Sequence, residues 1–231
     1  MANPRVIYHH PLWVRSAHWV NVICMTVLLM SGLQIFNAHP ALYWGDVSDF
    51  DNPLVAISGF PGWATLPGSQ WLAMGRRWHF FFAWGFVANG IFYTLIAIAR
   101  GHLRRDLAPS LKDMRQIGYS IRQHLRLRFP KGVEAMHYNV LQKLAYLTVI
   151  CVLCPLIIFA GLAMSPQLDA TYSSLLWIFG GRQSARTVHF ICAFSLLAFV
   201  IVHLLMVLVS GVWNNFRSMI TGWYDIGEHH G

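Results

Sequence analysis

Two histidines, His189 and His203, lie fourteen residues apart in a segment that carries no Asp, Glu, Lys or Arg. Fourteen residues make almost four turns of an α-helix, so both imidazoles face the same side, about 21 Å apart along the axis. The uncharged run between Arg186 and Arg217 exceeds the roughly 20 residues that a helix needs to cross a bilayer. One helix therefore offers a nitrogen ligand near each membrane surface, which predicts two metal centres stacked across a membrane.

Two more histidines lie at the ends of other apolar segments, His18 at the predicted inner end of the first and His79 at the predicted outer end of the second. Depth in the membrane then pairs His18 with His203 and His79 with His189. A lone histidine in such a segment is more often a hydrogen-bonded packing residue. Two depth-matched pairs favour a ligand role, because ionisable groups within membrane helices are costly.

The pairs lack the further ligands that most metal ions require. Zinc needs three or four protein ligands, and no Asp or Glu lies near either pair in sequence. Two opposed imidazoles suit a metal whose other positions are already filled, which is the iron of haem. With both axial positions occupied, such a centre has no open site for substrate, so the pattern predicts two haems that pass electrons.

An arginine stands three residues before three of the four histidines, at Arg15, Arg76 and Arg186. This spacing places each guanidinium one helical turn from the imidazole, where it can pair with a haem propionate. The alternative is that these arginines only mark helix ends. Gly32, fourteen residues after His18, is expected to give the outer porphyrin room beside the first helix, and close helix packing is the alternative.

Composition defines the elements that must hold these residues. The chain has 231 residues, of which 56% are hydrophobic and only 11% charged, against about 25% charged in soluble domains. The sequence predicts an all-α membrane protein with four transmembrane helices in one bundle that forms a single domain over residues 1–231. We expect these helices at about residues 17–36, 78–99, 144–163 and 188–212.

The distribution of basic residues predicts the orientation. Thirteen Lys and Arg residues lie on the side that holds both termini and four on the other, so the N and C termini are predicted to be cytoplasmic. The net charge of +8 follows from this asymmetry, and it gives no reason to expect binding to nucleic acid.

Two long loops connect the predicted helices. The outer loop, residues 37–75, is rich in Trp, Pro and Gly and is interpreted as a docking face for an extracytoplasmic partner, or as a cap that shields the bundle. The inner loop, residues 100–143, is basic. It contains an amphipathic pattern that indicates a helix on membrane lipid, or a solvated linker, and its apolar positions are Leu111, Met114, Ile117, Ile121 and Leu125.

Four sequence elements together resemble a known family: Arg15-Ser-Ala-His18-Trp19, Arg76-Arg-Trp-His79-Phe80, Arg186-Thr-Val-His189-Phe190, and His203. They are similar to the four-helix di-haem cytochrome b subunits of bacterial respiratory complexes, those of nickel–iron hydrogenase, formate dehydrogenase and thiosulfate-reductase-type enzymes. The resemblance implies an inner-membrane subunit that carries electrons between the quinone pool and an extracytoplasmic redox subunit. A hydrogenase, a dehydrogenase or a molybdenum enzyme is the partner class implied, and the long outer loop is most like that of the thiosulfate-reductase-type members.

The same resemblance implies a quinone site near the inner haem. The segment Tyr138-Asn139-x-x-Gln142-Lys143 is similar to the formate dehydrogenase segment that lines such a site, and Asn139 is the implied quinone contact. Leu141 stands where that segment has Gly. Read without the resemblance, Asn139 and Lys143 are interfacial polar residues.

Two other functions are compatible with the pattern. One is a self-contained membrane oxidoreductase that acts on ferric chelates or superoxide at the outer haem. The other is a metal-ion transporter that uses the histidines as transient ligands, which predicts a protein without a Soret band. The four predicted spans contain no Asp or Glu, and this counts against transport.

Overall fold

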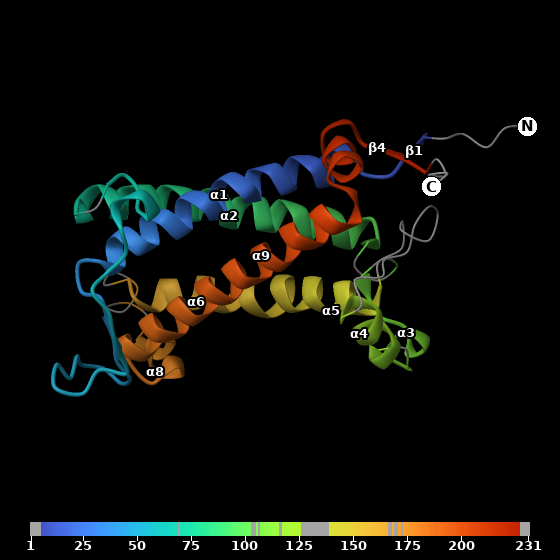
Figure 1. Ribbon diagram of the computed structural model, residues 1–231. Coiled ribbons are helices and arrows are strands. Elements are labelled where there is room, and N and C mark those ends of the chain that lie inside the picture. The colour runs from blue at the N-terminus through green and yellow to red at the C-terminus, as the bar shows by residue number, and fades with distance from the viewer. Residues whose placement is uncertain are drawn as a thin grey trace, which may run out of the picture. The chain divides into compact units, whose positions relative to one another are not determined.

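The computed structural model describes residues 6–68, 70–102, 105, 107–115, 117–125, 139–165, 168, 171 and 173–226. This part of the chain is mostly helical, with a few short strands (Figure 1). Among the described residues, four helical segments are long and apolar enough to cross a membrane. The all-α, four-helix membrane fold that the sequence predicted is therefore confirmed.

Each membrane segment is longer than the uncharged core from which it was predicted. The helices are α1 (Leu12–Phe36), α2 (Leu72–Ala99), the continuous segment Val140–Ala163, and α9 (Arg182–Thr221). The predicted starts at residues 17, 78, 144 and 188 were therefore too late. Backbone hydrogen bonding continues past the first charged side chain, whereas a charge-based boundary stops there.

The third segment is irregular in the middle. It consists of α5 (Val140–Thr148), a π-helical turn (Val149–Leu153) and α6 (Cys154–Ala163). Pro155 has no N–H to donate to the carbonyl of Cys151 and its ring crowds that carbonyl. The wider π turn just before the proline accommodates this interruption.

The last segment also changes direction, at a glycine. Gly211 has φ 109° and ψ 83°, which is not helical, and the helix resumes beyond it up to Thr221. A positive φ of this size favours glycine. The predicted end at residue 212 therefore coincides with a real break, although helical structure continues after it.

The chain divides into two compact units. Unit 1 comprises Met1–Trp19, Ile91–Ile150 and Ala198–Gly231, and unit 2 comprises Val20–Gly90 and Cys151–Leu197. His18 and His203 belong to unit 1, whereas His79 and His189 belong to unit 2. Each predicted histidine pair is thus contained within one unit.

Unit 1 also holds a strand pair that the sequence analysis did not anticipate. Strands β1 (Val6–Tyr8) and β4 (Trp223–Asp225) pair antiparallel. Gly222 lies just before β4 with φ 89°, and a Cβ there would lie 2.6 Å from the Tyr8 ring. A side chain at residue 222 would therefore push β4 away from β1.

The inner loop contains the helix that its amphipathic pattern indicated, in two pieces. These are α3 (Leu111–Arg115) and α4 (Ile117–Leu125). Ser110 precedes the first piece: its hydroxyl accepts from the Asp113 N–H at 3.1 Å, and its own N–H donates to Asp113 Oδ2 at 2.9 Å. Such reciprocal capping stabilises a helix start. Residues 126–138 of the predicted loop lie outside the described residues.

Candidate functional site

The structure places the four candidate histidines in two facing pairs. In unit 1 the ring centroids of His18 and His203 are 6.4 Å apart, an arrangement called here the inner pair. In unit 2 the ring centroids of His79 and His189 are 6.1 Å apart, the outer pair. Each pair joins two different helices, α1 with α9 and α2 with α9.

This spacing leaves room for one metal ion between each pair of rings. An imidazole nitrogen lies about 2 Å from the metal it binds, so two imidazoles on opposite sides of one metal place their centroids roughly 6 Å apart. In the described part of the chain, no three His, Cys, Asp or Glu side chains gather as a metal site. The donor set is thus two imidazoles at each position, which fits a haem iron and not a zinc ion.

In the outer pair, His189 has one ring nitrogen fixed by the backbone. Its Nδ1 lies 2.9 Å from the carbonyl oxygen of Ile157 in α6. A carbonyl oxygen only accepts, so Nδ1 carries the proton and Nε2 keeps its lone pair for a metal. Metal-binding histidines commonly donate their second nitrogen to a carbonyl in this way.

A glycine allows that approach. A Cβ on Gly161 would lie 3.2 Å from His189 Cε1 and 3.4 Å from its Nδ1. A Cβ at this position would require the ring to shift by a few tenths of an ångström, and a larger side chain would require more. The sequence analysis missed Gly161, because nothing in the local pattern of α6 distinguishes it from a packing glycine.

His79 is held in a similar manner from α1. Its Nδ1 lies 3.1 Å from the hydroxyl of Ser31, which is fully buried. Gly32 lies against the same ring, since a Cβ there would lie 3.4 Å from His79 Cε1. Gly32 is therefore part of the outer pair's surroundings, whereas Ser31 was not among the predicted site residues.

The inner pair has different surroundings. The Nδ1 atom of His18 is buried and has no hydrogen-bond partner among the described residues. The ring of His203 stacks on Phe199, with centroids 6.1 Å apart and an interplanar angle of 16°. Phe199 in turn meets Tyr146 of α5 edge to face, at 6.1 Å. Stacking on Phe199 therefore orients the His203 ring.

The three predicted propionate-binding arginines make different contacts. Arg15 donates to the carbonyl of Ile220, Arg186 donates to the carbonyl of His39 and lies over the Phe36 ring, and Arg76 lies 5.8 Å from the Phe80 ring centroid. In the described part of the chain, no carboxylate pairs with any of the three. Among the described residues their charge thus has no carboxylate partner, which is compatible with binding an anionic group.

The outer loop is attached to the start of α9. The N–H groups of Gln183 and Ser184 both donate to the carbonyl of Gly45, at 2.9 and 3.2 Å, and the Thr187 hydroxyl donates to the carbonyl of Tyr43 at 2.6 Å. The two bonds to Gly45 satisfy N–H groups that a helix start leaves open. The loop is therefore connected directly to the helix that carries His189.

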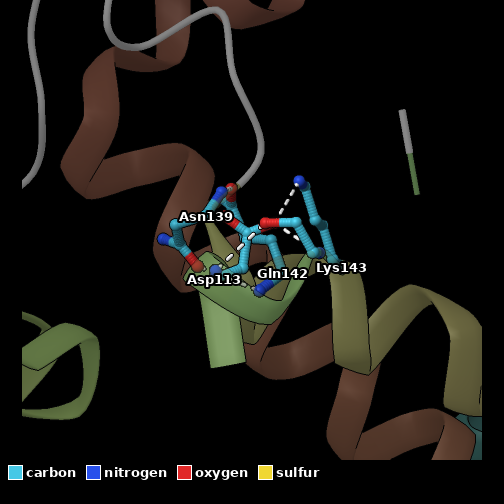
Figure 2. Close-up of polar contacts among 5 residues, drawn as sticks. Asp113, Asn139, Gln142 and Lys143 are labelled. Atoms are coloured by element: carbon cyan, nitrogen blue, oxygen red, sulfur yellow. Dashed lines mark hydrogen bonds and ion pairs between the residues drawn. The ribbon is translucent and has the colours of Figure 1, made fainter. Parts of the chain in front are cut away.

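The segment implied to bind quinone has a structural role in unit 1. Figure 2 shows Asn139 and Gln142 in a reciprocal cap at the start of α5: Asn139 Oδ1 accepts from the Gln142 N–H at 3.0 Å, and Gln142 Oε1 accepts from the Asn139 N–H at 3.1 Å. Lys143 pairs with Asp113 of α3 at 2.8 Å. Tyr138 lies outside the described residues. Asn139 is thus the N-cap of α5, and its side-chain oxygen Oδ1 already accepts a hydrogen bond within this cap.

The Lys143–Asp113 ion pair makes stability depend on pH. The Lys143 ammonium, and after it the Ser110 N–H, lower the pKa of Asp113 to about 2, below the usual value near 4. The pair therefore stabilises the fold above about pH 4, and this contribution disappears as the pH falls towards 2. We expect Asp113→Asn to lower stability by about 0.2–1 kcal/mol at pH 6, and this loss should shrink as the pH falls from about 4 through 2, where Asp113 becomes protonated in the folded protein as well. Thermal unfolding in detergent, followed by circular dichroism, measures the stability at each pH, with Asp51→Asn as the control.

Comparison with known proteins identifies the family of the chain. The family model described as prokaryotic cytochrome b561 matches residues 9–222. A protein of Azospira oryzae, described as the putative protein-methionine-sulfoxide reductase subunit YedZ1, is 32% identical over 198 residues, which is 86% of this chain and 89% of the relative. The range matched by the family model includes the positions of all four histidines. The relative's name refers to a methionine-sulfoxide reductase, so it does not support the hydrogenase, dehydrogenase or molybdenum-enzyme partners that the resemblance implied.

Proposed function

The chain belongs to the prokaryotic cytochrome b561 family, and from this membership we propose that it carries electrons through two b-type haems between the quinone pool and an extracytoplasmic redox subunit. Family membership makes it a haem-binding electron-transfer protein of the bacterial membrane that works with a redox partner. The number of haems, the quinone and the partner's identity are the parts we propose.

One observation supports the two-haem arrangement above all. Both histidine pairs have the spacing of two imidazoles on one metal, 6.4 Å and 6.1 Å between centroids. When bound, each haem supplies a one-electron couple. His18 and His203 would hold one haem, and His79 and His189 would hold the other. Arg15, Arg76 and Arg186 are the proposed partners of the propionates.

We place the proposed quinone site in unit 1, beside the inner pair. Asn139 and His18 both belong to this unit, and the amide of Asn139 lies at the first turn of α5. A neutral amide can exchange hydrogen bonds with a quinone carbonyl or a quinol hydroxyl. The distribution of basic residues predicts that both chain termini are cytoplasmic, so we propose that the quinone binds on that side.

The proposed partner is a methionine-sulfoxide reductase subunit that docks on the outer loop. Support comes from the name of the Azospira oryzae relative and from the tip of the loop, where Val47 and Phe50 are each 75% exposed. The only charged residues of residues 37–75 are Asp46, Asp49 and Asp51. An apolar tip with carboxylates around it fits a partner surface that is apolar and basic.

We expect removal of these charges to slow the reaction with the partner. In the double variant Asp46→Asn/Asp51→Asn, the second-order rate constant for oxidation of the reduced protein by the reductase subunit should fall about tenfold at low ionic strength. The difference should shrink at high salt, because exposed charges are screened. Stopped-flow absorbance measures the rate. Arg122→Gln, on the inner loop, should leave it unchanged, and an equal loss in both variants would contradict docking at the outer loop.

A reduced-minus-oxidised spectrum with haem quantitation tests the function directly. We expect the purified protein to show b-type bands and two haems per chain, and a short-chain quinol to reduce them. A colourless protein would support the metal-ion transporter instead. Rapid ferric or superoxide turnover by the isolated chain would support the self-contained oxidoreductase.

A further inference from the structure

Ser31 contacts a candidate ligand from inside the bundle. It lies on α1, one residue before Gly32, and its side chain is 0% exposed. Its hydroxyl oxygen lies 2.6 Å from the carbonyl oxygen of Val27, 3.3 Å from that of Leu28 and 3.1 Å from Nδ1 of His79. The His79 imidazole also hydrogen-bonds to the Leu28 backbone, so the Ser31 hydroxyl acts on this ring together with that carbonyl. A hydroxyl has a single proton, so the Ser31 hydroxyl can donate either to a carbonyl or to the imidazole and must accept in the other hydrogen bond.

The carbonyl determines the direction of both hydrogen bonds. Since the Val27 carbonyl can only accept, the Ser31 hydroxyl donates its one proton there. Towards His79 the hydroxyl oxygen must then accept, which requires the proton of that imidazole to be on Nδ1. The lone pair of His79 is therefore on Nε2. His189 shows the same assignment, because its Nδ1 lies 2.9 Å from the Ile157 carbonyl.

We propose that Ser31 is a positioning residue for the outer haem: its hydroxyl holds His79 in the Nδ1-protonated form and strengthens Nε2 as a ligand. This inference rests on the proposed function, in which His79 is an axial ligand. A hydrogen bond from the second nitrogen raises the basicity of an imidazole ligand. A more basic ligand stabilises ferric iron over ferrous iron, so Ser31 lowers the potential of the outer haem.

The contrast with the inner pair makes the effect specific to one site. Nδ1 of His18 is buried without a hydrogen-bond partner in the described part of the chain, so no equivalent acceptor from this part strengthens that ligand. A change at Ser31 should therefore alter one of two haem potentials and leave the other as it was.

The experiment is a redox titration of the purified, haem-loaded Ser31→Ala protein, followed by absorbance. We expect the reduction equilibrium of one haem to shift about tenfold towards the ferrous form, which is a rise of about 59 mV for a one-electron couple. The electron paramagnetic resonance signal of the same ferric haem should also shift, since the imidazole plane is no longer held. The second haem should keep its potential and its signal.

Two further variants separate the hydroxyl from the packing. Ser31→Thr keeps the hydroxyl and should keep the wild-type potentials. Thr26→Ala removes an exposed hydroxyl of the same helix that makes the same kind of bond, to the Val22 carbonyl at 2.8 Å, and should change neither potential. Loss of the outer haem in Ser31→Ala but not in Ser31→Thr also supports the proposal. An equal change in Ser31→Ala and Ser31→Thr, or no change in Ser31→Ala, overturns it.

His79→Ala distinguishes this inference from the proposed function. If His79→Ala retains one haem while Ser31→Ala leaves both potentials unaltered, the ligand assignment stands and the role of Ser31 is refuted. If His79→Ala retains two haems, the ligand assignment itself is wrong, and the role of Ser31 is refuted with it.

Discussion

The His203→Ala protein should contain one haem per chain instead of two and should no longer be reduced by quinol. His203 faces His18 across 6.4 Å in unit 1, so its loss removes one of the two axial ligands of the inner haem. The outer pair lies entirely in unit 2 and keeps both of its imidazoles. Haem quantitation measures the first effect. The rate of quinol-driven haem reduction measures the second, and it should fall at least about tenfold.

A histidine outside the two pairs provides the matched control. His102 faces the Trp13 ring at 5.7 Å and belongs to neither pair, so His102→Ala should retain two haems and the wild-type rate. Two haems and full quinol reduction in His203→Ala would refute the inner-site assignment. Dithionite should still reduce the remaining haem of His203→Ala, which distinguishes a lost electron entry point from a misfolded protein.

Gly161→Val should selectively empty the outer site. Even a single Cβ at residue 161 would lie 3.2 Å from His189 Cε1, and the branched side chain of valine needs more space than that. The ring must move, which breaks the bond between its Nδ1 and the Ile157 carbonyl. Overpacking of this kind costs about 1–3 kcal/mol. We expect fewer than two haems per chain with the inner haem spectrum unchanged, and a lower unfolding temperature.

Gly90→Val tests whether any valine in a membrane helix has the same effect. Gly90 lies within α2, and a Cβ there would have nothing within 4 Å. This variant should keep both haems and unfold close to the wild-type temperature. If Gly90→Val loses as much haem as Gly161→Val, the loss comes from helix packing in general and not from displacement of His189.

The sequence was sufficient for the properties that depend on position along one helix. The distance between His189 and His203 and their common face follow from the regular rise and rotation of an α-helix. Because an unpaired charge is costly in lipid, membrane-spanning helices are recognised in a sequence as long segments without charged residues. These properties need no knowledge of neighbouring helices, and so the four-helix fold could be predicted before the structure.

The tertiary structure decided which groups meet across helices. Gly161 lies twenty-eight residues before His189 and Ser31 forty-eight residues before His79, and neither separation is a helical repeat within one element. Only packing brings the Ile157 carbonyl to Nδ1 of His189 and the Ser31 hydroxyl to Nδ1 of His79. The direction of those hydrogen bonds determines which ring nitrogen is free for a metal. Periodicity along one chain contains no information about contacts between separate helices, because these depend on how the helices rotate and approach one another.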